Sequence, residues 1–418
     1  LSQALQIDGA SAVLERSGQL GRLTVVESPL VPFRHAPGLS LFSTSEPPPQ
    51  LGLFSDGEGF QAITSASKEP ERLAFLEQST NALAYYLRAP GTVFVPAAGG
   101  GMEILRALHF GAETINAVEL NPQAVRLLQE DFAGYTGLLV ESPGVELVSS
   151  DARGFLAGTD RRYDVLQLTV DGSGASGGLS GLSEDYELTV EMMRLYLKHL
   201  EPGGFLSITG STRVPPRESL KLVSELIEAL QPLDATDRLL MIRGWQTFTL
   251  LAKNGPAGAQ DIARMRAFAE SLSFDLVWYP GMRASDANQY NQLREPWYHE
   301  GVRALLGDRR EDFVAGYPFD IRPATDDRPY FRNFFRWPLL AQGWEARGRG
   351  GMTLLELGYP LLVATLLQAL LAAMLLIVFP LLFVGTRSHS TASQRWKVFA
   401  YFASIGLAFV FLEVVFLQ

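Results

Sequence analysis

The segment Thr92–Asn121 constrains the fold more than any other part of the chain. Its first apolar residues, Val93–Val95, favour a β-strand, and the absence of polar alternation means that both faces of this strand must be covered. Ala97–Gly101 then predict a turn in which Gly99 and Gly101 let the backbone pass close to a ligand. A helix over 102–108 follows, and the partial positive charge at its amino terminus favours an anionic or polar ligand group.

A second apolar run, Ile115–Val118, predicts the next strand and ends on Glu119. A carboxylate at the carboxyl end of such a strand can accept hydrogen bonds from both hydroxyl groups of a ribose. Glycines in a strand-to-helix turn are often purely conformational, so their pairing with Glu119 is the more specific signal. Together these features predict a nucleoside-binding α/β domain.

Strand and helix patterns continue to alternate beyond this point. We predict strands at Val145–Ser149, Tyr163–Val170 and Phe205–Thr209, with a helix from about Glu184 to Leu200. This alternation predicts a parallel, doubly wound sheet. An antiparallel hairpin within Leu239–Ala252 would close the sheet at one edge.

The residues before the glycine turn predict a small β-rich lead domain. Its candidate strands are Arg22–Glu27 and Leu51–Ser55, and a helix over Lys68–Leu87 would lead into the first strand of the α/β domain. The chain therefore divides into four parts: a lead domain (1–88), the α/β domain (89–255), an appended helical and loop-rich region (256–350) and a membrane region (351–418).

The composition excludes several classes of protein. The chain has 418 residues and a formal net charge of −10, whereas nucleic-acid-binding grooves normally need a basic face. We therefore expect no nucleic-acid partner, while a cationic or zwitterionic substrate suits this charge. Cysteine is absent, and the five histidines lack metal-ligand spacing, so we expect neither disulfides, thiolate chemistry nor a metal site.

The last part of the chain predicts two antiparallel transmembrane helices. Leu357–Gly385 has no charged residue and is longer than the roughly 20 apolar residues that span a bilayer. The second apolar segment, Trp396–Gln418, contains one deep charge, Glu413, which is functional, paired with another helix or near the membrane interface. Because the chain begins at Leu1 and ends in an apolar run, we expect further sequence at both ends.

Six motifs occur in an order that resembles the spermidine synthase family. They are GGG at 99–101, VELNP at 118–122, DAR at 151–153, YDVLQL at 163–168, LSEDY at 182–186 and LEPGG at 200–204. The TDDRPYF run, Thr325–Phe331, is similar to the membrane-bound, polytopic spermidine-synthase-like proteins, in which transmembrane helices flank such a domain. The resemblance covers roughly residues 20 to 255 and implies a Rossmann-like methyltransferase fold that binds S-adenosylmethionine or decarboxylated S-adenosylmethionine.

The resemblance also implies roles for particular residues. The cofactor-binding candidates are Gly99, Gly100 and Gly101 under the methionine or aminopropyl part, Glu119 at the ribose, Asp151 at the adenine amino group and Ala152 on the adenine ring. A bottom-up alternative exists for Asp151, which can instead cap the helix through Leu156.

Catalysis by aminopropyl transfer needs a base for the attacking amine. The family places an aspartate directly after the YDV strand, but Thr169 stands there in this chain and Asp171 follows two residues later. Asp171 is our catalytic candidate, although Asp-Gly is also a common turn. Tyr186 is a second candidate that could orient a nucleophile. The alternative for its neighbours is that Ser183 and the following acids begin a helix.

Asp326 and Asp327 more simply predict a turn with a salt bridge to Arg328.

Two functions follow from these observations. The first is an integral-membrane transferase that moves a methyl or aminopropyl group to a small-molecule amine or a membrane-delivered acceptor, with the glycine-rich loop 171–181 as a lid. The second is a non-catalytic subunit that acts as a scaffold beside other membrane subunits. Basic residues flank the first span almost equally, so the cytosolic cofactor decides the orientation. We expect a bacterial inner-membrane protein whose soluble domain is cytoplasmic.

Overall fold

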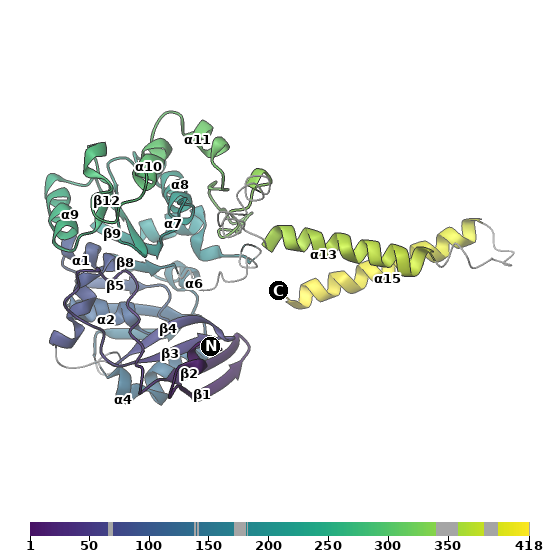
Figure 1. Cartoon of the computed structure of the whole chain (residues 1–418), viewed down its shortest axis with the longest axis horizontal. Coiled ribbons are helices and arrows are strands. Elements are labelled where there is room, and N and C mark those ends of the chain that lie inside the picture. The colour runs from purple at the N-terminus through teal and green to yellow at the C-terminus, as the bar shows by residue number, and fades with distance from the viewer. Residues whose placement is uncertain are drawn as a thin grey trace. The chain divides into compact units, whose positions relative to one another are not determined.

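The computed structural model describes residues 1–65, 70–137, 139, 142–170, 181, 183–339, 358–379 and 392–417. They form two compact units, Leu1–Tyr359 and Pro360–Gln418 (Figure 1).

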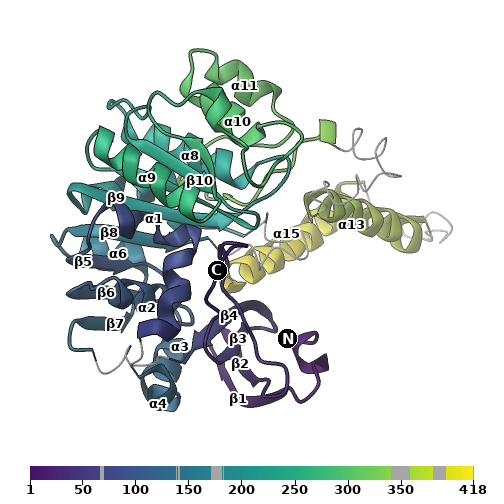
Figure 2. The same cartoon turned by 60° about the vertical axis from the view of Figure 1, so that its left-hand side comes forward.

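The first unit is built on an eight-stranded mixed sheet with the order β12-β10-β11-β9-β8-β5-β6-β7. The strands are β5 (Thr92–Val95), β6 (Thr114–Glu119), β7 (Val145–Ser149), β8 (Tyr163–Thr169), β9 (Leu200–Ser211), β10 (Leu239–Arg243), β11 (Thr247–Lys253) and β12 (Asp275–Trp278). The five strands from β7 to β9 pair in parallel, and the remaining pairs are antiparallel. Figure 2 shows β9, β8, β5, β6 and β7 stacked in this order. The predicted parallel-rich sheet and its late hairpin are confirmed, whereas the sequence reading missed β12.

Helices cover both faces of this sheet, as the uninterrupted apolar strands require. Phe94 of β5 enters one core, while Val93 and Val95 enter the other. The helices that contribute to the first core include α6 (Ala152–Ala157), α7 (Val190–Lys198), α8 (Glu218–Leu230) and α10 (Trp297–Leu306). The helices of the second core include α1 (Leu83–Leu87), α2 (Met102–His109), α3 (Pro122–Arg126) and α9 (Ala259–Ser271). The sheet is therefore doubly wound.

A separate four-stranded antiparallel sheet forms the amino-terminal part of this unit. It consists of β1 (Ser11–Gly18), β2 (Gly21–Glu27), β3 (Gln50–Ser55) and β4 (Glu58–Thr64) in sequence order. The strands predicted at the positions of β2 and β3 are confirmed, and β1 and β4 are additional. Leu23, Val25 and Leu51 of this sheet join the same core as α2, so the two sheets share apolar packing.

Two predicted helices are wrong in part. Lys68 lies outside the described residues, and 70–87 is two 3-10 segments, Pro70–Gln78 and Thr80–Ala82, followed by the short α1. Ser79 interrupts the helix because it is extended and its backbone bridges to Leu39. The helix predicted from Glu184 begins only at Val190, because Thr189 is the N-cap and accepts a hydrogen bond from the Met192 amide.

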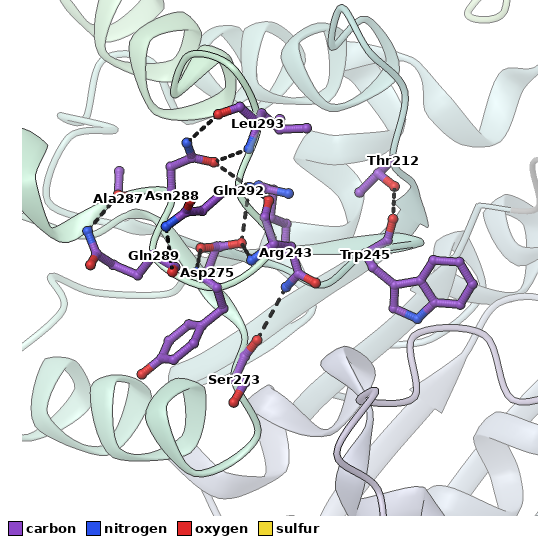
Figure 3. A network of polar contacts seen from close by, with 12 residues as sticks. Thr212, Arg243, Trp245, Ser273, Asp275, Ala287, Asn288, Gln289, Gln292 and Leu293 are labelled. Carbon is purple, nitrogen blue, oxygen red and sulfur yellow. Dashed lines mark hydrogen bonds and ion pairs between the residues drawn. The ribbon is translucent and has the colours of Figure 1, made fainter.

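The appended region is held to the sheet by a buried polar network (Figure 3). Arg243 of β10 pairs with Asp275 of β12 at 3.0 Å, and both side chains are almost fully buried. The Asp275 carboxylate accepts from the amides of Tyr290 and Asn291, each at 2.9 Å. Arg243 also donates to the Asn288 amide oxygen at 2.9 Å. This network fixes the 288–291 loop to the sheet edge.

Residues 319–339, here called the strap, follow α11 (Arg310–Gly316) and pack on α8. The Lys221 ammonium of α8 donates to the carbonyl oxygens of Tyr330 and Asn333 at 3.2 and 3.3 Å. Glu225, one turn further along α8, accepts from the Ala324 amide at 3.1 Å. The buried polar residues of α8 thus satisfy backbone groups of the strap.

The second unit contains two apolar helices. The first is α13 (Gly358–Ala373), which continues through the π-helical turn Met374–Val378, and the second is α15 (Ala392–Leu417). Among the described residues, Gly358–Leu376 is the one helix long and apolar enough to cross a membrane, with a mean hydropathy of 2.0. The apolar stretch of α15, Trp396–Leu412, is shorter. Glu413 lies in α15, and its side chain is outside what the structure describes.

Candidate functional site

The order of the central strands creates a topological switch point. From β5 the chain moves outward through β6 and β7, then returns to β8 on the other side of β5 and moves outward to β9. In open α/β sheets, ligands bind outside the carboxyl ends of the strands at this point. This is a Rossmann-like α/β fold. The glycine turn follows β5, Glu119 ends β6 and Asp151 follows β7, so the predicted residues lie along this one edge.

The glycine turn needs glycine for two physical reasons. Gly99 and Gly101 have φ values of +50° and +85°, a conformation that side chains disfavour. Gly100 has no such φ, but a Cβ there would lie 2.3 Å from the Ala62 carbonyl oxygen of β4. A Cβ at Gly99 would likewise lie 2.7 Å from a Gln61 side-chain atom. The amino-terminal sheet therefore packs directly on one side of the turn.

Glu119 is held beside the glycine turn by backbone donors. Its carboxylate accepts from the Gly99 amide and from the Asn121 amide, each at 3.0 Å. The side chain is half-buried. These bonds fix the carboxylate between the ends of β5 and β6, where it was expected, and its binding of a ribose stays a prediction.

Asp151 performs the capping role that was the alternative for it. Its Oδ1 accepts from the Gly154 amide at 2.6 Å, and it is the N-cap of α6. Ala152 is fully buried in the core. Capping uses one carboxylate oxygen of Asp151, and the residue is otherwise exposed. Recognition of an adenine amino group by Asp151 therefore also stays a prediction.

Glu187 is a site residue that the sequence reading missed. Burial, together with the negative charges of Asp185, Glu119 and Asp151, raises the pKa of Glu187 to about 7. Burial also raises the pKa of Asp185, against the opposing charge of Arg332. Glu187 therefore lies within electrostatic reach of Asp185, Glu119 and Asp151. The available signal was the acidic run 184–187, which directly follows the loop after β8.

The two catalytic candidates have different outcomes. Asp171 lies outside the described residues, as does all of the loop 171–181 except Gly181. Tyr186 is exposed, and its hydroxyl donates to Glu184 at 3.1 Å. Its carbonyl oxygen accepts from Arg153 at 3.0 Å. The described contacts therefore fix the Tyr186 backbone and direct its hydroxyl to the neighbouring Glu184.

A second missed carboxylate lies at the end of β8. Thr169, which stands where the family has an aspartate, donates to Glu103 Oε1 at 3.2 Å. The Asn81 amide donates to the same oxygen at 3.0 Å, and Arg106 donates to Oε2 at 3.0 Å. Glu103 is only 8% exposed. The first turn of α2 thus supplies a carboxylate to the position that β8 leaves without one.

The TDDRPYF run forms the expected turn with a different ion pair. The Arg328 amide donates to the Thr325 carbonyl oxygen at 2.8 Å, which closes the turn. The predicted salt bridge from Asp326 to Arg328 is wrong, because Asp326 pairs with Arg153 at 2.6 Å and Arg328 donates to the Pro323 carbonyl oxygen. The turn faces α6 rather than folding onto its own arginine.

Comparisons with known proteins give only distant likenesses. No protein-family model and no curated protein matches the sequence. Among solved structures, spermidine synthase from Thermotoga maritima is 14% identical over 62% of this chain and 79% of its own, with a TM-score of 0.41. A probable spermidine synthase from Corynebacterium glutamicum ATCC 13032 is 14% identical over 72% and 95%, with a TM-score of 0.45. The putative methyltransferase yhhF from Escherichia coli is 16% identical over 47% and 93%, with a TM-score of 0.29. The fold assignment rests on the strand order.

Proposed function

We propose that the chain is a membrane-anchored transferase that binds S-adenosylmethionine or its decarboxylated form at the switch point. It would transfer a methyl or aminopropyl group to a small-molecule amine or a membrane-delivered acceptor. The observation that carries this proposal is the convergence of the glycine turn, Glu119 and Asp151 at the carboxyl ends of three adjacent parallel strands.

The chemistry of the donor set fits such a ligand. Carboxylates accept hydrogen bonds from ribose hydroxyls and from an adenine amino group. The group formed by Glu119, Asp151, Asp185 and Glu187 favours a cation, and a sulfonium is a permanent cation. Because β4 packs on one side of the glycine turn, a ligand at this turn would bind from another side.

The chain's own residues would orient the reactants and accept a proton. The sulfonium makes the adjacent carbon electrophilic. In the proposed transfer, the acceptor's lone pair would form the new bond to that carbon, the electrons of the carbon–sulfur bond would remain on sulfur, and a carboxylate near β8 would take the acceptor's proton. Glu103 and Asp171 are the candidates for this base, since Thr169 cannot serve.

The membrane assignment is part of the same proposal. The apolar helix Gly358–Leu376 would anchor the protein in a bacterial inner membrane with the α/β domain in the cytoplasm, where the ligand is made. Such an anchor suits a membrane-delivered acceptor or other membrane subunits as partners.

A non-catalytic scaffold is the second candidate, and specific observations favour it. Asp151 is used as a helix cap, Gly100 is explained by packing against Ala62, and Thr169 replaces an aspartate. In this alternative the sheet edge keeps its ancestral shape without binding a cofactor.

Isothermal titration of the detergent-purified protein separates the two candidates. We would titrate S-adenosylmethionine, its decarboxylated form and methylthioadenosine into the wild-type protein and into Glu119→Gln. The matched control is Glu113→Gln, since Glu113 is exposed just before β6 at the opposite edge of the sheet. We expect one sulfonium ligand to bind and the Glu119 variant to lose about tenfold in affinity, about 1.4 kcal/mol. Binding of none of the three ligands by the wild type would overturn the transferase and favour the scaffold.

A further inference from the structure

The strap is joined to the site by one bidentate ion pair. Arg153 of α6 donates through Nη1 to Asp326 Oδ2 at 2.6 Å and through Nη2 to Asp326 Oδ1 at 2.8 Å. The two residues are 173 positions apart in the sequence. Paired, parallel hydrogen bonds of this kind fix orientation as well as distance. Arg153 lies in the motif that begins with Asp151, so the pair connects the strap to the end of β7.

The same pair also holds the segment that carries Glu187. Arg153 Nη2 donates to the Tyr186 carbonyl oxygen and to Thr189 Oγ1, each at 3.0 Å. Thr189 Oγ1 in turn donates to Asp326 Oδ1 at 2.7 Å. Residues 186 and 189 are therefore both tied to the pair, and Glu187 lies between them.

Backbone bonds continue this connection on both sides. The Asp185 amide donates to the Pro329 carbonyl oxygen at 2.7 Å, and the Val190 amide donates to the Ala324 carbonyl oxygen at 2.9 Å. The Asp326 amide donates to Glu191 of α7 at 3.0 Å. The segment from 185 to 190 thus lies between α6 and the strap, and its backbone cannot move without breaking bonds to one of them.

We propose that Arg153 and Asp326 are positioning residues, which hold the 185–190 segment, and with it Glu187, against α6. The strap would then line the site, and in sequence it continues to residues 340–357 and the apolar helices. The effect on ligand affinity rests on the proposed function, whereas the effect on the segment itself does not. Neither residue touches the reacting atoms.

The test compares two bidentate Arg–Asp pairs whose aspartates both lie in the strap. Asp326→Asn removes one charge from the positioning pair. Asp320→Asn is the matched control, because Asp320 pairs with Arg322 two residues away, through bonds of 2.8 and 2.5 Å, and that pair stays within the strap. Both variants would be made in the full chain and purified in detergent.

The first measurement is amide hydrogen exchange, which needs no ligand. In Asp326→Asn we expect the amides of Asp185 and Val190 to exchange at least tenfold faster than in the wild type, while amides of the central strands are unchanged. Asp320→Asn should leave the 185–190 amides as they are. Equal exchange in the two variants would overturn the proposal.

The second measurement is the pH profile of sulfonium-ligand affinity, which a merely stabilising pair would not move. We expect Asp326→Asn to bind the sulfonium ligand about tenfold more weakly and to lose the pH dependence of affinity that Glu187 causes. Arg153→Lys keeps the positive charge but cannot form the paired hydrogen bonds of a guanidinium, so its affinity should fall between that of Asp326→Asn and that of the wild type. The exchanged pair Arg153→Asp with Asp326→Arg should recover part of the affinity. An unchanged profile in Asp326→Asn would overturn the proposal. If the wild type binds no ligand, the proposed function fails, and hydrogen exchange still decides the positioning role.

Discussion

Replacing Glu187 with Gln should change how the affinity for a sulfonium ligand depends on pH. Burial, together with the charges of Asp185, Glu119 and Asp151, raises the pKa of Glu187 to about 7. Near neutral pH the side chain is therefore about half ionised before the ligand binds. A cation in this group of carboxylates favours the ionised form, so binding should release a proton.

The magnitude follows from that pKa. With a value of about 7, roughly one-tenth of Glu187 is ionised at pH 6 and roughly nine-tenths at pH 8. If the ligand requires the ionised form, affinity should rise about tenfold between these pH values, about 1.4 kcal/mol. The effect of rising pH on the free energy of unfolding has the opposite sign. The folded chain retains a proton that the unfolded chain loses between about pH 4.5 and 7, so without ligand the free energy of unfolding falls across this range, by about 3 kcal/mol.

Isothermal titration at pH 6, 7 and 8, in buffers with different ionisation enthalpies, measures both the affinity and the proton release. Glu187→Gln should bind with a flat pH profile and resemble the wild type at pH 6. Glu113→Gln, at the opposite edge of the sheet, should keep the slope. Methylthioadenosine is uncharged at sulfur and should show little slope even with the wild type. A wild-type slope that persists in Glu187→Gln would refute the assignment of this titration to Glu187.

Three further predictions concern stability. Gly100→Ala places a Cβ 2.3 Å from a backbone oxygen of β4 and should lower the free energy of unfolding by about 1–3 kcal/mol. In the control Gly134→Ala, in α4 (Ala133–Thr136), the new Cβ meets open space, so the free energy of unfolding should not fall. Thermal melts of the two variants compare these stabilities. Asp275→Asn leaves Arg243 buried without its ion-pair partner and should cost about 3–5 kcal/mol in denaturant melts. Burial lowers the pKa of Lys221 to about 8, so the unfolded chain binds more protons above pH 8 and stability should rise by about 2 kcal/mol toward pH 10. Lys221→Met should abolish this rise, and an unchanged rise would contradict the assignment.

The sheet could be predicted from sequence because its signals are local. Val93–Val95 and Ile115–Val118 are short apolar runs that end in a glycine turn and an acid, and the rule for parallel strands then places those ends along one edge. Of the two interpretations of the glycines, close approach to a ligand stays a prediction. Conformation explains Gly99 and Gly101, and close packing against Ala62 explains Gly100.

The missed features depend on contacts between distant parts of the chain. Burial and the charges of Glu119 and Asp151 raise the pKa of Glu187, and no spacing within 184–187 reveals these distant carboxylates. Asp326 was expected to pair with Arg328, which is two residues away. Its partner is instead Arg153. Local pattern gives the nearest opposite charge, and only the tertiary fold gives the actual one.

Glu103 allows a last prediction about the position that Thr169 occupies. Its carboxylate is held by Thr169, Asn81 and Arg106 at the carboxyl end of β8, where the proposed transfer would need a proton acceptor. Glu103→Gln keeps the shape of the side chain and removes its charge. We therefore expect it to lower turnover by at least about 100-fold while sulfonium affinity changes little.

Turnover can be followed in native membranes supplemented with the soluble small-molecule fraction of the same cells, as release of methylthioadenosine or S-adenosylhomocysteine. Adding Thr169→Asp to Glu103→Gln returns a carboxylate to the same place from the adjacent strand and should recover part of the rate. Thermal melts of both variants distinguish loss of a proton acceptor from loss of the buried ion pair with Arg106. If Glu103→Gln keeps full turnover, the base lies elsewhere, and Asp171 becomes the residue to replace next. If the double variant melts like the wild type but recovers no rate, a carboxylate at the end of β8 is not sufficient to accept the proton. The proton must then leave by a different path.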